Sequence, residues 1–432
     1  MGCVVLEKIA KLIFIDENKE LIISSFFAFA VRILGALSAF LATFFIAKFL
    51  GAEESGYYFL AFSVVTVLAV FSGVGLENTV LRYIGSDSAY SASVFQKSLI
   101  IVLVVSSLSA GGIYFASYHV ATVIFSKPAL YPVLQAMSVG VIGLAVLTVA
   151  SMALQGLRRI PMSIWILNIS VNLFLVACVY SADVSLATYL ASAYSVSAML
   201  TAIFGVVLFW YFKPRIVGSF VSWKAVFSSC MPLWVVAIMT QLAQWSGQFF
   251  AGIYVESDLV ALLAVAQRTA MLSSFVLVAV NLVVAPQFAA LYRQGDMLSL
   301  EILAIKSVKL ISVLALPLIG MMLIFPSFIM SMFGSEYVAG VPLLRILAIG
   351  QFVNAITGSV GFLLMMSGYE RDMRNLMIIS GCFALSLTWL LTANYGIIGA
   401  AVSTAVVVAA QNLMAVYFVK KRLGFNTLAV WR

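Results

Sequence analysis

The feature that most constrains this chain is a continuous run, residues 375–419, that contains no Asp, Glu, Lys or Arg. A helix that spans the hydrocarbon core of a bilayer needs about 20 apolar residues, so this run is long enough for two spans. The turn-forming segment 392–396 divides it near the middle. Over the whole chain 9% of residues are charged and 64% are apolar, whereas soluble domains carry about 25% charged residues. The pattern predicts an integral membrane protein and excludes a disordered chain, a coiled coil and an ordinary cytosolic enzyme.

Charge-free runs elsewhere in the chain locate the other spans, because a charged side chain in hydrocarbon is costly. Together with the divided run they predict an all-α protein with twelve transmembrane helices. The ten runs before the divided one are 21–47, 56–76, 98–118, 131–155, 163–182, 186–212, 225–250, 259–285, 310–334 and 341–367.

The distribution of Lys and Arg predicts the orientation of these helices. With both termini in the cytoplasm, 19 basic residues fall in cytoplasmic segments and 2, Lys48 and Lys127, fall on the opposite side. Cytoplasmic loops of membrane proteins carry such an excess, which also explains the net charge of +8 without nucleic acid. The longest loops, 79–97 and 286–309, are expected on the cytoplasmic side, and the second has the mixed composition of an amphipathic interfacial stretch.

The loop near the midpoint predicts a division into two lobes of six helices each. We expect the following organisation: a cytoplasmic N-terminal segment 1–20, an N-lobe 21–212, a cytoplasmic linker 213–224, a C-lobe 225–419 and a cytoplasmic tail 420–432.

Three basic residues, Arg32, Arg268 and Arg345, lie inside predicted spans. Each would cost about 2.5–3.5 kcal/mol at the bilayer centre, so we expect them to face a wet cavity or a partner. No Asp or Glu occupies the middle of any predicted span, so their partner would be an exchangeable anion such as a phosphate, a pyrophosphate or a uronate, which a guanidinium binds in a bidentate manner. The alternative is snorkelling to the interface, which the sequence favours for Arg345.

Amide side chains within the spans form a second set of candidate residues. The spacing of Gln241, Gln244 and Gln248 places them on one helical face, and Asn168 and Asn172 are four residues apart. These amides would line a path for sugars, or they would form hydrogen bonds between helices. A third group of residues would form a cytoplasmic gate or a plain interfacial salt bridge: Glu77, Asn78 and Arg82.

The chain shows no sign of a catalytic or metal centre. Its one histidine, His119, falls in a short outer loop, and the four cysteines are too scattered for a zinc site or a disulfide framework. A membrane polymerase or ligase would need a general acid or base near the outer face. We therefore expect no enzyme activity, no cofactor and no metal.

Four stretches resemble the lipid-linked oligosaccharide flippases of the O-antigen and capsule type, in the superfamily that also holds multidrug (MATE) exporters and the lipid II flippase. They are 49–85 (FLGAEESGYYFLAFSVVTVLAVFSGVGLENTVLRYIG), 232–296, 333–368 and 394–424. The resemblance implies two six-helix lobes around a central cavity, alternating access, and a polyprenyl-diphosphate sugar as substrate. It also implies that Arg32 and Arg268 hold the anionic substrate. Where many relatives carry an acid in the seventh helix, this chain has Gln244-Trp245-Ser246.

The resemblance further implies a place in the bacterial cytoplasmic membrane and a role in polysaccharide or lipopolysaccharide biosynthesis. The expected partners are the lipid-linked oligosaccharide, membrane lipids and a glycan polymerase or chain-length regulator. Alternatives are a multidrug exporter of the same fold, which would need buried carboxylates, a glycan polymerase or ligase, and a structural scaffold. The scaffold leaves the arginines within the spans unexplained.

Overall fold

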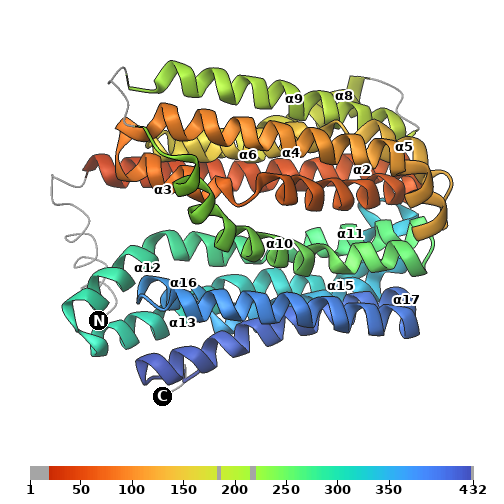
Figure 1. The fold of residues 1–432 in the computed structure, drawn as a ribbon. Helices are drawn as coiled ribbons and strands as arrows, with labels where there is room; N and C mark the ends of the chain where they lie inside the picture. The colour runs from red at the N-terminus through yellow and green to blue at the C-terminus, as the bar shows by residue number, and fades with distance from the viewer. Residues whose placement is uncertain (1–18, 182–185, 215–219, 430–432) are drawn as a thin grey trace.

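The computed structural model describes residues 19–181, 186–214 and 220–429, and this part of the chain consists of helices with no β-strand. Ten helical stretches are long and apolar enough to cross a membrane. The helices form two bundles packed side by side: in Figure 1 the described residues up to 212 lie above, and most of those from 223 on lie below. The predicted all-α membrane fold is confirmed, because a helix satisfies every backbone hydrogen bond within its own segment, as hydrocarbon requires.

The N-lobe packs around α6, which contacts α2, α3, α4 and α9. Its helices are α2 (Lys19–Gly73), α3 (Leu76–Ser86), α4 (Ser91–His119), α5 (Leu130–Met137), α6 (Gly140–Gly156), α7 (Ile160–Ile164), α8 (Ser170–Ser181) and α9 (Ala187–Phe212), with a 3₁₀ turn η2 (Ser88–Tyr90) and π-helical turns η3 (Val120–Ile124) and η4 (Trp165–Ile169).

The C-lobe packs around α17, which contacts α10, α15 and α16. Its helices are α10 (Trp223–Tyr254), α11 (Ser257–Met271), α12 (Ser274–Gln294), α13 (Met297–Ile324), α14 (Pro326–Ser331), α15 (Val341–Thr357), α16 (Val360–Met366) and α17 (Glu370–Leu423), with a 3₁₀ turn η5 (Ser335–Gly340). The helix α10 also contacts α2 and α3, so it lies between the lobes.

Two of these helices are each broken by a glycine with positive φ. The break lies at Gly51 in α2 (φ 76°) and at Gly396 in α17 (φ 57°), a region that glycine adopts without strain. At the second break the chain approaches itself so closely that a Cβ on Gly399 would lie 1.9 Å from the carbonyl oxygen of Leu391. With α2 and α17 each divided at the glycine, the described residues of each predicted run are largely helical, and several runs, such as 259–285, extend over two consecutive helices. The number of membrane crossings itself stays a prediction.

The prediction that segments 79–97 and 286–309 are loops is wrong, because the helices continue beyond the apolar runs. Residues 79–97 hold most of α3 and the start of α4, and residues 286–309 hold the end of α12 and the start of α13. The buried residues of α3, Leu76, Thr79, Val80 and Ile84, recur at helical spacing. Charges mark where hydrocarbon ends, whereas a helix ends where its apolar stripe and its backbone hydrogen bonds end.

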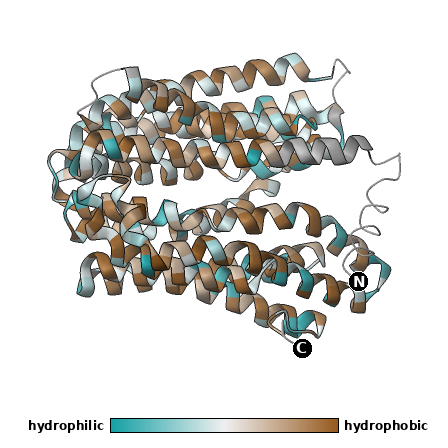
Figure 2. Ribbon diagram, turned by 180° about the vertical axis from the view of Figure 1, so that it is seen from behind, coloured by the Kyte–Doolittle hydropathy of each residue, from teal (hydrophilic) through white to brown (hydrophobic). Residues whose placement is uncertain are grey.

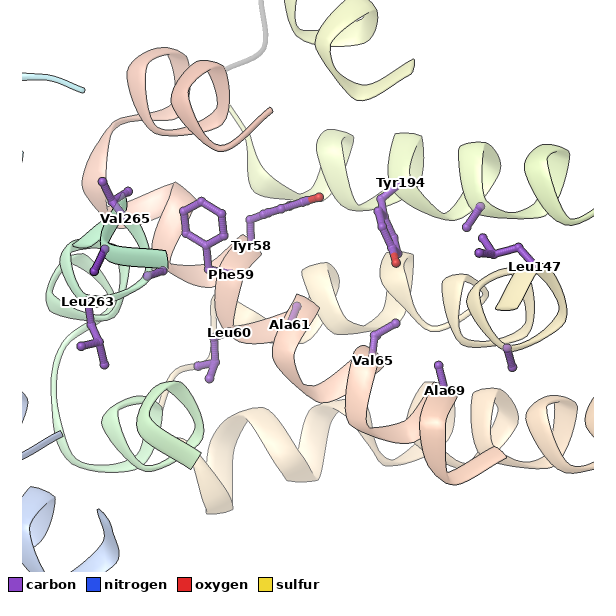
Figure 3. Packing of buried hydrophobic residues seen from close by; sticks show 14 of the residues in the cluster. Tyr58, Phe59, Leu60, Ala61, Val65, Ala69, Leu147, Tyr194, Leu263 and Val265 are labelled. Carbon is purple, nitrogen blue, oxygen red and sulfur yellow. The ribbon is translucent and has the colours of Figure 1, made fainter. Parts of the chain in front are cut away.

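The second segment of α2, residues 52–73, packs between the two lobes. Figure 3 shows its residues Tyr58, Phe59 and Leu60 with α11 on one side and Tyr194 of α9 on the other. The contact with α11 is very close, because a Cβ on Gly56 would lie 1.8 Å from the carbonyl oxygen of Ser257. A small residue at a helix crossing allows this approach.

The start of α2 and the end of α17 lie at the same end of the bundle (Figure 1). Hydrophobic residues cover the length of the helices in both lobes, and hydrophilic residues are frequent at the helix ends (Figure 2). Of the predicted boundary segments, 1–18, 215–219 and 430–432 lie outside the described residues. The helix α17 continues to Leu423, into the predicted tail 420–432, and the place of this tail in the cytoplasm stays a prediction. Which side of the membrane holds this end stays a prediction.

We expect Gly56→Ala to destabilise the protein by about 1–3 kcal/mol, as overpacking of a close contact does. The reason is that the new methyl group must push the backbone of Ser257, and hence α11, away from α2. Thermal unfolding of the detergent-solubilised protein measures the effect. In the matched control Gly111→Ala no atom lies within 4 Å of the new methyl group, so the melting temperature should stay or rise. Equal melting temperatures for both variants would contradict the close crossing.

Candidate functional site

Of the three arginines within the predicted spans, Arg268 on α11 lies between the lobes. Its side chain is mostly buried and points at the N-lobe, where Nη1 donates a hydrogen bond of 2.8 Å to Oγ1 of Thr43. The guanidinium carbon lies 5.1 Å from the centre of the Phe59 ring and 5.2 Å from that of Phe62. These distances allow cation–π attraction, which grows when the cation is removed from water.

Among the residues that the structure describes, no carboxylate forms an ion pair with Arg268. The ion pair in this part of the chain joins Asp372 in the first turn of α17 to Arg422 in its last turn. A hydroxyl group and two aromatic rings therefore surround a positive charge that keeps the capacity to bind an anion. The shortage of acids in the predicted spans led us to expect an arginine without a carboxylate partner, but Arg268 packs against Thr43, Phe59 and Phe62 and lines none of the three cavities described below. The wet cavity expected around it stays a prediction.

The structure does not bring the other two arginines to Arg268. Arg32 on the first segment of α2 and Arg345 on α15 are both exposed. Neither makes a hydrogen bond or an ion pair with another described residue, and no contact joins them to Arg268. Exposure of Arg345 near the start of α15 accords with the snorkelling alternative. The substrate-binding roles of all three arginines stay predictions.

The glutamine face of α10 divides between two cavities. Gln241 lines a cavity of about 310 Å³ between α10 and the N-lobe, whereas Gln244 lines a cavity of about 250 Å³ within the C-lobe. Three residues turn a helix by about 300°, so these side chains diverge by about 60° and reach different lobes. Gln248 is 1% exposed, and its Oε1 atom has no hydrogen-bond partner. Because α10 lies between the lobes, Gln241 and Gln244 reach cavities on different sides of the helix, although they are only three residues apart.

The cavity beside the N-lobe, which we call the interlobe cavity, brings three predicted site residues together. Glu77 of α3, Asn168 of η4 and Gln241 of α10 all line it. The indole Nε1 of Trp245 donates to Oε1 of Gln241 over 3.1 Å and orients its amide. Asn172 is not part of this lining, because its Nδ2 donates to the backbone oxygen of Asn168 within its own helix.

The three gate candidates do not form the salt bridge that the sequence left open. No ion pair joins Glu77 to Arg82 in the described part of the chain, and Asn78 is exposed. Arg82 instead donates a hydrogen bond to Oγ of Ser229 at the start of α10. It therefore ties α3 to the helix between the lobes, and the gate itself stays a prediction.

A third cavity, of about 210 Å³, has an almost purely apolar lining. Val64 and Leu68 of α2, Trp245 and Phe249 of α10, and Leu385 of α17 line it. Both lobes thus form this cavity, and Trp245 in its wall donates a hydrogen bond to Gln241 in the wall of the interlobe cavity.

Sequence reasoning missed the contacts that close the lobes at the end that holds Gly51. Oγ of Ser55 and the hydroxyl of Tyr337 lie 2.6 Å apart, and the backbone N–H of Ala52 donates to Glu336 over 2.9 Å. Lys127 donates from Nζ to the carbonyl oxygen of Gly252 over 2.6 Å, and burial lowers the pKa of this ammonium group. We call these three pairs the closing contacts. The polar residues in the short segment 334–337 are the only sequence signal for them.

We expect Tyr337→Phe to weaken the closing contacts, because it keeps the ring but removes the hydroxyl, which also donates to the backbone oxygen of Gly51 over 3.3 Å. The buried hydrogen bond with Ser55 alone is worth about 0.5–1.5 kcal/mol. Maleimide labelling of an Ala52→Cys probe, in a background without the four natural cysteines, measures the opening. The labelling rate should rise about two- to tenfold, as that energy implies. Tyr395→Phe is the matched control, since Tyr395 is exposed. Equal rates in both variants would show that the contact does not hold this end closed.

Solved structures of the MOP superfamily have the fold of this chain. A multidrug resistance MATE family transporter in an inward-facing conformation is 15% identical, with a TM-score of 0.73 over 93% of this chain and 98% of that chain. The lipid II flippase MurJ, in an inward closed conformation, is 15% identical, with a TM-score of 0.71 over 92% and 87%. A MOP superfamily transporter from Pyrococcus furiosus Vc1, whose binding pocket is described as having reverse polarity, is 15% identical, with a TM-score of 0.67 over 93% and 95%.

These likenesses confirm the MATE-like fold that the sequence resemblance implied. Among curated proteins, none matches this sequence. The family model of polysaccharide biosynthesis proteins matches residues 22–292, which is more than half of the chain. The chain therefore belongs to the family of polysaccharide biosynthesis proteins, as a multi-pass membrane protein with the fold of MOP superfamily transporters.

Proposed function

We propose that this protein is a flippase that moves a polyprenyl-diphosphate-linked oligosaccharide from the cytoplasmic to the outer leaflet by alternating access. The observation that carries the proposal is the mostly buried guanidinium of Arg268, which lies between the lobes and forms no ion pair with a carboxylate of the described residues. An unneutralised cation in this position attracts an anionic headgroup, and a diphosphate matches the planar donor geometry of arginine. The protein makes and breaks no covalent bond in this scheme.

Two further findings support a glycan substrate. The chain belongs to the family of polysaccharide biosynthesis proteins, and one protein with the same fold is a lipid II flippase. We extend the proposal to an O-antigen or capsule repeat unit, to the bacterial cytoplasmic membrane with both termini in the cytoplasm, and to a glycan polymerase or chain-length regulator as the partner that receives the product.

The three parts of such a substrate match three environments between the lobes. Arg268 supplies positive charge for the diphosphate. The amides of Asn168 and Gln241 in the interlobe cavity supply hydrogen bonds for sugar hydroxyls. The apolar cavity beside Trp245 and Phe249 accepts part of the prenyl tail, whose remainder stays in lipid.

Alternating access requires that the lobes separate at the end that the closing contacts now hold. The closing contacts are three hydrogen-bonded pairs, and the α2–α11 crossing at Gly56 adjoins them. Separation removes the contacts of Arg268 with Thr43, Phe59 and Phe62. A bound anion then takes the place of these contacts beside the guanidinium. The opened state is therefore more stable with substrate bound than without it.

One observation favours a second candidate, a multidrug exporter. Glu77 lines the interlobe cavity, and a carboxylate there would attract a cationic drug. Several solved MATE transporters share the fold. We favour the flippase because Arg268 of the C-lobe directly contacts the N-lobe, through a hydrogen bond to the Thr43 hydroxyl and through the rings of Phe59 and Phe62.

We expect Arg268→Ala to lower the rate of flipping at least tenfold, because a charge-assisted hydrogen bond contributes about 1.5–3 kcal/mol. Arg268→Lys, which keeps the charge but not the planar fork, should retain part of the rate. The measurement is transfer of an undecaprenyl-diphosphate-linked oligosaccharide across proteoliposome membranes. The control is Arg293→Ala, since Arg293 is exposed and its Nε bonds only to its own helix.

The effects of Arg268 and Glu77 variants distinguish the flippase from the exporter. If both Arg268 variants flip at the wild-type rate while Glu77→Gln abolishes resistance to cationic drugs, the protein is an exporter. Glycan profiling of a strain that lacks the chain provides a second test, in which a flippase leaves undecaprenyl-linked repeat units on the inner leaflet.

A further inference from the structure

The cavity inside the C-lobe is lined by four amide side chains from four different segments. Gln244 of α10, Gln267 of α11, Gln351 of α15 and Gln411 of α17 surround a space of about 250 Å³. Three hydroxyl-bearing residues complete its polar lining: Thr240, Ser380 and Thr404. We call this space the amide cavity. Converging polar groups from separate helices form a binding site rather than a packing defect, because packing defects in proteins have apolar walls.

No charged side chain lines the amide cavity. A metal ion or an organic cation bound there would need carboxylates to offset its desolvation, and an anion would need Lys or Arg. Arg268 follows Gln267 directly in the chain but points the other way, to Thr43 of the N-lobe. The helix α11 therefore separates a positive face from a neutral one, and the occupant of the amide cavity is a neutral molecule.

The hydrogen bonds around the cavity leave both donors and acceptors free. Oε1 of Gln351 accepts from Oγ of Ser274 over 2.8 Å and from Nδ2 of Asn354 over 3.1 Å, so its amino group is the part left for the cavity. Gln267 donates from Nε2 to the backbone of Gln244 over 3.3 Å, and its Oε1 is buried without a hydrogen-bond partner.

A second unpartnered group is the hydroxyl of Ser380. Ser380 is 2% exposed and Gln267 is 8% exposed, and both Ser380 Oγ and Gln267 Oε1 lack partners. Leaving such a group unpaired costs about 1–3 kcal/mol. A molecule whose groups each donate and accept satisfies this mixture of free amino, carbonyl and hydroxyl groups, and sugar hydroxyls do so.

The cavity also has the size and the access that a sugar ring requires. Its volume corresponds to about eight water molecules at about 30 Å³ each. Thr240 and Gln244 on α10 are exposed, whereas Gln267 and Ser380 are buried, so the cavity opens beside α10 and ends among buried polar groups. Because α10 lies between the lobes, this opening adjoins the path proposed for the substrate.

We propose that the amide cavity binds one neutral sugar residue of the lipid-linked glycan, through Gln267, Gln351 and Ser380. This inference rests on the proposed flippase function and assigns the sugar a site in the C-lobe, separate from the positive charge of Arg268 that serves the diphosphate. The cavity thereby discriminates glycans by the hydroxyl pattern of that residue.

Two kinds of lipid probe, without and with one sugar, test the proposal. The first is bare undecaprenyl diphosphate. The second is the same lipid carrying a single glucose, galactose or N-acetylglucosamine. Their affinities for the full-length protein in nanodiscs are measured for the wild type and for Gln267→Met and Gln351→Met, which keep the side-chain length. The control is Gln287→Met on α12, where the amide is exposed and bonds only to its own helix. Thermal unfolding confirms that each variant is folded, and the two cavity variants are independent of each other.

We expect the wild type to bind at least one sugar-carrying probe more tightly than the bare lipid. Each cavity variant should lower that affinity about two- to tenfold, as loss of a neutral hydrogen bond does. The affinity for the bare lipid should stay unchanged, and Gln287→Met should behave as the wild type.

Two other results would distinguish failure of the sugar-site inference from failure of the flippase proposal. If the wild type binds the bare lipid and every sugar-carrying probe equally, or if the cavity variants weaken both kinds of probe alike or neither, the amide cavity holds only water and the inference is overturned while the flippase proposal stands. If the wild type binds neither kind of probe, the proposed function fails and this inference fails with it.

Discussion

The close crossing of α2 and α11 is the contact on which the rest of the arrangement depends. At Gly56 the backbones of the two lobes approach so closely that no side chain fits between them. Lipid gives little hydrophobic drive for helices to associate, so such backbone contacts between small residues supply much of the attraction. Along the same pair of helices, Arg268 of α11 contacts Thr43 and Phe59 of α2 in the opposite lobe.

The position of Arg268 creates an electrostatic asymmetry across α11. One side of the helix carries a cation that hydroxyl and aromatic groups stabilise without neutralising it. The other side carries Gln267 and lines a cavity without any charge. A substrate with an anionic diphosphate and a neutral glycan has the same division, and this match gives the flippase proposal its physical basis.

The helix α10 explains how one molecule has separate cavities for separate parts of a substrate. It lies between the lobes, and consecutive turns of its polar face meet the N-lobe through Gln241 and the C-lobe through Gln244. Its Trp245 lines the apolar cavity and bonds to Gln241, which lines the interlobe cavity. Rotation of this helix during exchange between the two states would alter all three spaces together.

The sequence by itself determined the membrane fold, because charge-free runs longer than a bilayer is thick have no alternative to helices. It also identified Arg268 as a cation without a carboxylate partner, since the shortage of acids is a property of composition. It could not show that Arg32 and Arg345 are exposed apart from Arg268, or that the glutamine face is divided between two cavities. Helical periodicity states which residues share a face, whereas the neighbours of that face depend on how distant helices pack. Only the tertiary structure decided those neighbours, because contacts such as Gly56 with Ser257 and Ser55 with Tyr337 join segments that local patterns do not relate.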